Sequence, residues 1–272
     1  MANYTAADIK DLRSKTGAGM LDVKKALDEA DGDAEKALEI IRVKGLKGIA
    51  KREDRAALEG LVVADIADKD GQKVGTLLEL NCETDFVAKN EKFITLANEA
   101  LATAVASGAS NADELEAAGF NITDAQAAIG EKLQVRRIGR VEGEAIEAYM
   151  HKTAKDLPPQ VGVLVATDAA GAGVARDVAM HIAAYSPLYL SREDVPADVV
   201  ENERRIADEI ARNEGKPEAA LPKIVEGRVN GFFKENVLLD QAFARDPKKT
   251  VGQIVTEAGG TVTGFVRFRV GA

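Results

Sequence analysis

The chain has 272 residues, of which one is cysteine, two are histidine and none is tryptophan. A single cysteine, Cys82, excludes a disulfide bond within the chain, and His151 and His181 leave too few soft ligands for a usual zinc site. No apolar run approaches the roughly 18 residues that a membrane-spanning helix needs, and the amino terminus has acids where a secretory signal is apolar. We therefore expect a cytoplasmic protein that has no structural metal and does not act on a membrane.

The usual signatures of nucleotide binding and of nucleophilic catalysis are missing. There is no Gly-x4-Gly-Lys-Ser/Thr loop, and residues 16–19 lack both the third glycine of a dinucleotide-binding turn and a strand before it. No Gly-x-Ser-x-Gly elbow is present, and Cys82 has no histidine near it in the sequence. The sequence thus predicts neither an enzyme active site nor a cofactor, and residues 16–19 are interpreted as a turn between helices.

The net charge of −9 argues against a nucleic-acid binder, because neutralising phosphates needs clustered Lys and Arg. One segment departs from this balance, since residues 42–55 hold six bases and only two acids. The bases are Arg42, Lys44, Lys47, Lys51, Arg52 and Arg55. Two interpretations stay open: a solvated linker helix, or a phosphate-tracking element of a translation-associated RNA-binding protein.

The amino-terminal part predicts a small module of three short helices within residues 1–44. Thr5 and Asp8 have the spacing of a capping box, and Asp33 precedes the third apolar stripe, which begins at Ala34. Gly45 and Gly48 follow within the basic segment and predict a linker to the rest of the chain.

After this module the pattern changes to strands, and one order of elements occurs twice. Residues 61–67 and 74–81 have strand composition and flank an Asp-Gly pair suited to a hairpin turn. An amphipathic helix follows, with apolar positions Phe93, Leu96, Ala97, Ala100, Leu101 and Ala104. Strand composition recurs at residues 144–150 and 161–167, and a helix with Val174, Val178, His181, Ile182 and Tyr185 comes next. Strands at residues 133–141 and 261–270 close the two copies.

These observations predict an α+β fold with a core of two related β-β-α-α-β subdomains and antiparallel sheets. Residues 1–54 form the helical module with its linker, residues 55–142 the first subdomain, and residues 143–191 with 236–272 the second. The second copy contains an insertion, residues 192–235, which predicts a projecting antiparallel helical hairpin. Its two apolar stripes are Val199, Ile206 and Ile210, and Leu221, Ile224, Val225, Val229 and Phe232.

The segment from residue 81 to residue 90 joins a strand to a helix, where loops held by rigid elements often carry function. Glu83 and Asp85 are compatible with a carboxylate pair for metal or acid-base chemistry, but helix capping by Thr84 and Asp85 explains the same residues. Phe86 suits either an inward core position or an exposed probe that enters a partner's pocket. The sequence leaves both alternatives for Phe86 open.

Two segments resemble the signatures of a known family. Residues 12–27 contain Leu12-Arg13-x2-Thr16-Gly17-Ala18-Gly19-Met20 followed by Lys24-Lys25-Ala26-Leu27, and residues 79–90 read Glu-Leu-Asn-Cys-Glu-Thr-Asp-Phe-Val-Ala-Lys-Asn. Both resemble the elongation factor Ts family, and further matches at residues 178–184, 215–217, 223–228, 249–252 and 264–268 extend the likeness over nearly the whole chain.

The resemblance implies a guanine-nucleotide exchange factor that is not itself an enzyme. In that family the segment matching Thr84, Asp85, Phe86 and Val87 contacts the GTPase domain of elongation factor Tu, and its aromatic ring disturbs the Mg²⁺ site so that GDP leaves. Further partner contacts are implied for Arg13, Met20, Met180 and His181, although His181 also fits the apolar stripe of its helix.

The resemblance also implies an architecture and an assembly. We expect a ubiquitin-associated-like amino-terminal module, a coiled-coil hairpin, and assembly as a homodimer or as a heterotetramer with the partner, without direct contact to nucleic acid. Some family members continue with a further helical module beyond the position of Ala272, and we expect its contacts to be absent here.

Overall fold

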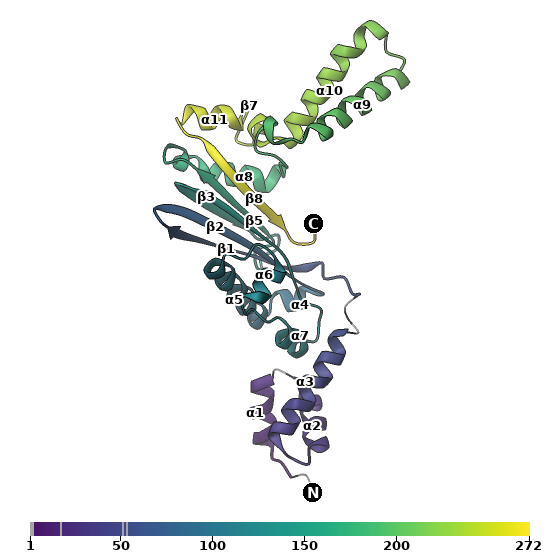
Figure 1. Ribbon diagram of the computed structural model, residues 1–272, viewed down its shortest axis with the longest axis vertical. Helices are drawn as coiled ribbons and strands as arrows, with labels where there is room; N and C mark the ends of the chain where they lie inside the picture. The colour runs from purple at the N-terminus through teal and green to yellow at the C-terminus, as the bar shows by residue number, and fades with distance from the viewer. Residues whose placement is uncertain (1–2, 17, 51, 53) are drawn as a thin grey trace.

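The computed structural model describes residues 3–16, 18–50, 52 and 54–272, and for residues 46–50 it describes the backbone only. The molecule is elongated, with a helical bundle at one end, a layered core in the middle and a helical hairpin at the other end (Figure 1). The carboxyl terminus lies beside the layered core. Among the helices that the structure describes, none combines the length and the apolar character needed to cross a bilayer.

Three helices form the amino-terminal bundle: α1 (Ala6–Thr16), α2 (Met20–Glu29) and α3 (Ala34–Ala50). The predicted capping box is confirmed, since Thr5 N donates to Asp8 Oδ2 (2.7 Å) and Asp8 N donates to Thr5 Oγ1 (3.3 Å). Asp33 caps α3 by accepting hydrogen bonds from the backbone of the first helical turn. The bundle encloses a small core made of Leu12, Val23, Ala26, Leu27, Ala30 and Ala37.

The third helix is longer than the module expected within residues 1–44, because α3 continues without a break through Gly45 and Gly48 to Ala50. A Cβ at Gly45 would lie 2.6 Å from the Cβ of Ala127, so the missing side chain lets α3 approach the helix that contains Ala127. Glycine costs a helix about 1 kcal/mol relative to alanine, and this close packing offsets the cost. Lys51 and Glu53 of the basic segment lie outside the described residues.

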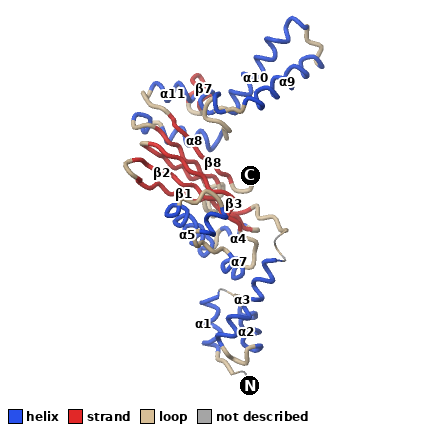
Figure 2. Tube along the Cα trace, in the orientation of Figure 1, coloured by secondary structure: helices blue, strands red, loops and turns tan. Residues whose placement is uncertain are grey.

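The first sheet is antiparallel in the order β1-β2-β3, with β1 (Glu59–Lys69), β2 (Gln72–Cys82) and β3 (Gln134–Gly143) (Figure 2). The predicted turn is confirmed, since Asp70 and Gly71 join β1 to β2 with φ angles of 52° and 85°. Because β2 lies in the centre of the sheet, most of its residues are buried.

Helices cover one face of this sheet: α4 (Asp85–Ala88), α5 (Glu91–Ser107), α6 (Ala112–Ala117) and α7 (Thr123–Ile129) (Figure 1). All six apolar positions predicted for the helix after β2 are buried in α5. They pack with Leu61, Leu78 and Leu80 of the sheet in one apolar cluster.

The second sheet is antiparallel in the order β4-β5-β8, with β4 (Ala145–His151), β5 (Val161–Thr167) and β8 (Val262–Arg269). Its outer face carries α8 (Ala175–Tyr185) and α11 (Val251–Glu257). A small hairpin of β6 (Ala242–Phe243) and β7 (Asp246–Thr250) precedes α11 and was not predicted. The coarse prediction of an α+β fold with antiparallel sheets is confirmed.

The two sheets pack face to face. Val62 and Leu77 of the first sheet share a buried cluster with Leu164 and Phe268 of the second. A Cβ at Gly162 would lie 2.7 Å from Val62 Cγ1, so this position admits only glycine at the observed spacing. The core therefore has four layers in the order helix, sheet, sheet, helix.

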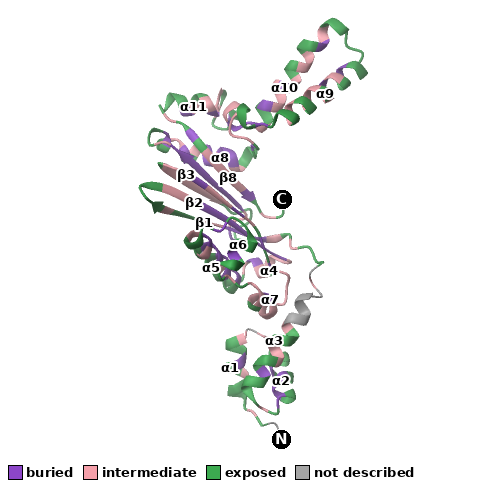
Figure 3. Cartoon of the chain, in the orientation of Figure 1, coloured by how far each residue is buried: buried purple, intermediate pink, exposed green. Residues whose placement is uncertain are grey.

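The projecting hairpin consists of α9 (Ala197–Asn213) and α10 (Leu221–Asn236). Most of its surface is exposed, whereas β2 and β5 are buried (Figure 3). The predicted stripe is wrong at Ile210, which is 40% exposed, because Ala207 and Ala211 occupy the seam and their small side chains let the helices approach closely. On α10, Leu221 and Val229 are buried as expected, with Phe233 as a further buried residue.

Candidate functional site

The loop after β2 is a candidate site because it presents an aromatic side chain on a short, well-capped helix. Thr84 has extended backbone angles, and its Oγ1 accepts a hydrogen bond from Val87 N, so Thr84 is the N-cap of α4. Asn90 caps α5 in the same way through Lys92 N (2.9 Å). The predicted capping role of Thr84 is therefore confirmed.

The structure decides the open question about Phe86, whose side chain is exposed. Its exposed fraction is 80%, the largest among the exposed large apolar residues of the described chain. Within α4, Ala88 is fully buried and Val87 is half-buried, so the short helix turns these two residues inward and Phe86 outward. The ammonium group of Lys89 lies 5.4 Å from the ring centroid, within cation–π range.

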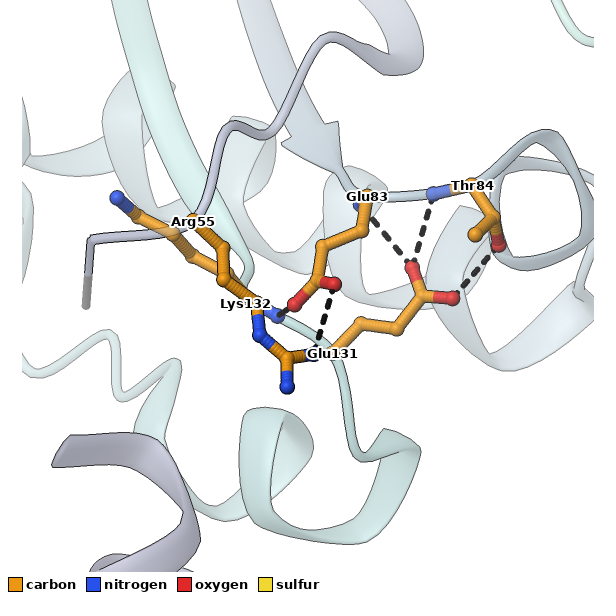
Figure 4. Close-up of polar contacts among 5 residues, drawn as sticks. All are labelled: Arg55, Glu83, Thr84, Glu131 and Lys132. Carbon is orange, nitrogen blue, oxygen red and sulfur yellow. Dashed lines mark hydrogen bonds and ion pairs between the residues drawn. The ribbon is translucent and has the colours of Figure 1, made fainter. Parts of the chain in front are cut away.

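Two glutamates tie the base of the loop to the segment before β3 (Figure 4). The carboxylate of Glu131 accepts hydrogen bonds from Glu83 N (3.0 Å), Thr84 N (3.0 Å) and Thr84 Oγ1 (2.6 Å). In return, Glu83 Oε1 accepts a hydrogen bond from Lys132 N (2.7 Å). The loop is thus tied to the segment that precedes β3.

Glu83 and Asp85 do not act as a carboxylate pair, because each has a different partner. Arg55 Nη1 lies 3.1 Å from Glu83 Oε2, and Lys89 Nζ lies 2.8 Å from Asp85 Oδ2. Partial burial acts to raise the pKa of Glu83, but the Lys132 N–H and the Arg55 guanidinium outweigh it and hold this pKa below its usual range. Among the described residues, no cluster of three His, Cys, Asp or Glu side chains suits a metal ion.

Lys89 connects the loop to the second sheet's side of the core. Its ammonium group bridges Asp85 and Asp156, which lies 3.0 Å away in the connection between β4 and β5. The hydrogen bond to Asp85 is the main cause that raises the pKa of Lys89, and the one to Asp156 adds to it. Both ends of α4 are therefore fixed to neighbouring elements.

Cys82 lies directly before the loop and is fully buried. Burial is the main cause that raises the pKa of its thiol to about 12, and its Sγ donates a hydrogen bond to the Thr84 carbonyl (3.2 Å). A thiol with this pKa is protonated at neutral pH, so Cys82 is a structural residue of the loop base.

His181 is 1% exposed and belongs to the core of the second sheet. Its Nδ1 accepts a hydrogen bond from Ala244 N (3.2 Å), which leaves the proton on Nε2, 2.8 Å from Gln241 Oε1. The ring stacks on Tyr185 with the centroids 4.6 Å apart, and burial lowers the pKa of His181. Tyr185 is 54% exposed and Met180 is half-buried, so these two neighbours of His181, and not His181 itself, are accessible at the surface.

Arg13 and Met20 are exposed in the amino-terminal bundle, in a different part of the molecule from the Phe86 loop (Figure 1). Met20 begins α2 and is 59% exposed. Thr16 Oγ1 donates to Leu12 O (2.7 Å) and accepts from Ala18 N (3.2 Å), so the described part of this segment is a turn between helices, as expected. Gly17 lies outside the described residues.

Three bases of the basic segment face carboxylates in the structure. Arg42 pairs with Asp124, Lys44 with Glu29, and Arg55 with Glu83. These pairs reduce the local excess of positive charge that motivated the RNA-binding alternative.

The sequence singled out Thr84, Asp85 and Phe86, and the structure brings them together in one capped turn. Sequence reasoning missed Glu131, which lies 47 residues from Thr84 along the chain. The available signal was its place directly after Gly130, the left-handed residue that ends α7, and before the closing strand.

Known proteins resemble this chain over its full length. The family described as Elongation factor TS matches residues 83–272. Proteins named elongation factor Ts from Beutenbergia cavernae, Micrococcus luteus and Kineococcus radiotolerans are 68%, 64% and 57% identical, and each alignment covers 100% of both chains. The class of protein that these relatives share is that of translation elongation factors. The chain belongs to the elongation factor Ts family.

Proposed function

We propose that this chain is a guanine-nucleotide exchange factor that binds elongation factor Tu in its GDP form and accelerates release of GDP. One observation carries the proposal: Phe86 is 80% exposed on a loop whose backbone donors are held by Glu131. An exposed aromatic residue on a rigid support is suited to enter a partner's pocket, where such residues commonly dominate binding.

Exchange of this kind requires no catalytic group and no nucleotide site on the factor. The factor needs only to bind more tightly to the partner conformation in which Mg²⁺ and GDP are poorly held. By linkage, it then weakens GDP binding by the same factor by which GDP weakens binding of the factor. Phe86 disturbs the Mg²⁺ and phosphate site in this proposal, with Thr84, Asp85 and Val87 forming the rest of the contact.

Further contacts are proposed on both sides of this loop. In the bundle, Arg13 and Met20 add attachment area for the GTPase. Near α8, Met180 and the exposed ring of Tyr185 form the contact, and His181 supports that ring from beneath by stacking.

We propose the domain division that the sequence predicts. Residues 1–54 form a ubiquitin-associated-like module, residues 55–142 and residues 143–191 with 236–272 form two related subdomains, and residues 192–235 form a coiled-coil hairpin. The shared plan is supported by two three-stranded antiparallel sheets, each with the second strand of its copy in the centre and a short helix before the last strand. A cytoplasmic location and assembly as a homodimer or heterotetramer are part of the same proposal.

The test is the affinity of the chain for elongation factor Tu in two states. Isothermal titration against the Mg²⁺–GDP form and against the nucleotide-free form should give much tighter binding to the nucleotide-free form. The ratio of the two affinities should equal the ratio by which the chain weakens GDP binding. Equal affinity for both forms would contradict the proposal, because a ligand without differential affinity shifts no equilibrium.

A parallel titration with labelled RNA distinguishes the exchange factor from the alternative, an RNA-binding protein. Binding to RNA with an affinity that falls steeply with salt would support that alternative. An acidic exchange factor should show no such binding.

A further inference from the structure

The hydrogen-bonding pattern at the base of the Phe86 loop shows which group fixes its direction. Pairing of β2 with β1 ends at Cys82 and its pairing with β3 ends at Asn81, so the sheet provides no ladder partners for residues 83 and 84. The N–H groups of Glu83 and Thr84 and the hydroxyl of Thr84 instead share one acceptor, the carboxylate of Glu131 (Figure 4). Among the ties at the base of the loop, the Glu131 carboxylate is therefore the one that binds both backbone donors of residues 83 and 84.

The second sheet joins the equivalent two segments, with the acceptor after the central strand as in the bond from Lys132 N to Glu83, and without an aromatic residue. After its central strand β5, Asp168 Oδ1 accepts hydrogen bonds from Gly171 N (2.8 Å) and from Thr261 N (3.0 Å), which precedes β8. The segment that follows is Ala-Ala-Gly-Ala-Gly, residues 169–173. Both copies thus join the end of the central strand to the start of the closing strand, but only the first copy uses this support to present a large exposed ring.

We propose that Glu131 is the positioning residue of the Phe86 loop. This inference rests on the proposed exchange function and adds the group that prepares its probe. Glu131 holds Thr84, Thr84 caps α4, and α4 directs Phe86 outward. With this order already present in the free chain, insertion of the ring into the partner does not require ordering of the loop at the same time.

Loss of the carboxylate should act mainly through Phe86, which is the largest exposed side chain of the turn that Glu131 supports. In Glu131→Ala, the two backbone donors turn to water and the loop samples other directions, so insertion of the ring becomes less frequent. The expected effect is a roughly tenfold lower rate of GDP release at saturating factor, with half-saturation changed less, because the other contacts remain. Glu131→Gln keeps an oxygen for the backbone donors and should retain most of the plateau rate.

A double-mutant cycle distinguishes positioning from general damage. Glu131→Ala is measured in the wild-type chain and in the Phe86→Ala chain by release of fluorescent GDP from elongation factor Tu. The proposal requires a loss in the first background and a much smaller one in the second. An equal loss in both backgrounds, or no loss in either, would overturn it. Asp168→Ala, which breaks the corresponding tie in the second copy, is the matched control and should show no coupling to Phe86.

A measurement without the partner separates this proposal from the proposed function. Because the chain has no tryptophan, Phe86→Trp introduces a single fluorescent probe into the loop. Time-resolved anisotropy should show a larger amplitude of nanosecond motion when Glu131→Ala is added, little change with Glu131→Gln, and none with Asp168→Ala. Unchanged probe motion in folded Glu131→Ala would overturn the positioning role, even if the wild-type chain releases GDP as proposed. If Glu131→Ala does not fold, Glu131→Ser, whose short side chain cannot reach the backbone donors of residues 83 and 84, replaces it in the cycle, and a loss that is independent of Phe86 again refutes the proposal.

Discussion

Removal of the Phe86 ring tests the functional assignment of the loop most specifically. Because the side chain is 80% exposed, Phe86→Ala should change the free energy of unfolding by less than about 0.5 kcal/mol. Burial of a phenylalanine in a partner contributes about 1.5–3 kcal/mol, and each 1.4 kcal/mol corresponds to a factor of ten. Catalysed GDP release at saturating factor should therefore slow by roughly 10- to 150-fold.

Stopped-flow release of fluorescent GDP from elongation factor Tu gives the rate, and urea unfolding gives the stability. Phe93→Ala is the matched control, because Phe93 is fully buried in α5 and its truncation should cost about 3–5 kcal/mol of stability. Phe86→Ala should thus lose release rate without stability, whereas Phe93→Ala should lose stability. An unchanged release rate in Phe86→Ala, or a stability loss like that of Phe93→Ala, would contradict a role of the Phe86 ring in the partner contact.

Three further predictions concern the other parts of the molecule. Deletion of residues 1–54 should raise the half-saturating concentration of factor more than it lowers the plateau rate, because the bundle adds attachment area; a lower plateau at unchanged half-saturation contradicts this. Replacement of residues 203–226, the outer part of the hairpin, by a short Gly/Ser linker should preserve cooperative unfolding and most GDP release while it reduces any self-association seen by sedimentation. A folded but inactive linker variant would place the hairpin in the exchange surface. The free energy of unfolding should fall as the pH drops below about 6.5, by up to about 1.4 kcal/mol per pH unit, because the unfolded chain binds a proton that buried His181, with its lowered pKa, does not. In His181→Phe, the free energy of unfolding measured in urea should depend less steeply on pH. An unchanged dependence would show that His181 is not the group that causes it.

The regular elements were predictable where burial imposes a simple period. The strand expected at residues 161–167 coincides with β5, because a strand covered on both faces consists almost entirely of apolar residues. The six apolar positions of α5 followed from helical spacing for the same reason. The Asp-Gly turn between β1 and β2 followed from its need for positive φ angles.

Features that depend on contacts between distant segments were not predictable from the local pattern. Gly45 indicated a linker, and its close approach to Ala127, which belongs to another helix, had no local signal. The face-to-face packing of the sheets depends on Gly162 meeting Val62 from the other copy. The hairpin β6–β7 has too few residues to show a period.

In the candidate site too, the local features were predictable from the sequence and the contacts between distant segments were not. Thr84, Asp85 and Phe86 are adjacent in sequence, and cap chemistry identified their turn. The exposure of Phe86 required the structure, since an exposed and a buried phenylalanine have the same local pattern. Glu131 required it too, because its hydrogen bonds join segments that only the pairing of β2 with β3 brings together.

The proposed function requires that the chain turns over as an exchange factor and does not merely bind the GTPase. The most direct measurement mixes elongation factor Tu loaded with fluorescent GDP, excess unlabelled nucleotide, and one molecule of this chain per ten molecules of GTPase. All of the label should leave at an accelerated rate, because each molecule of an exchange factor serves many partners in turn. Release of only about a tenth of the label in a fast phase, or release at the uncatalysed rate, would contradict it.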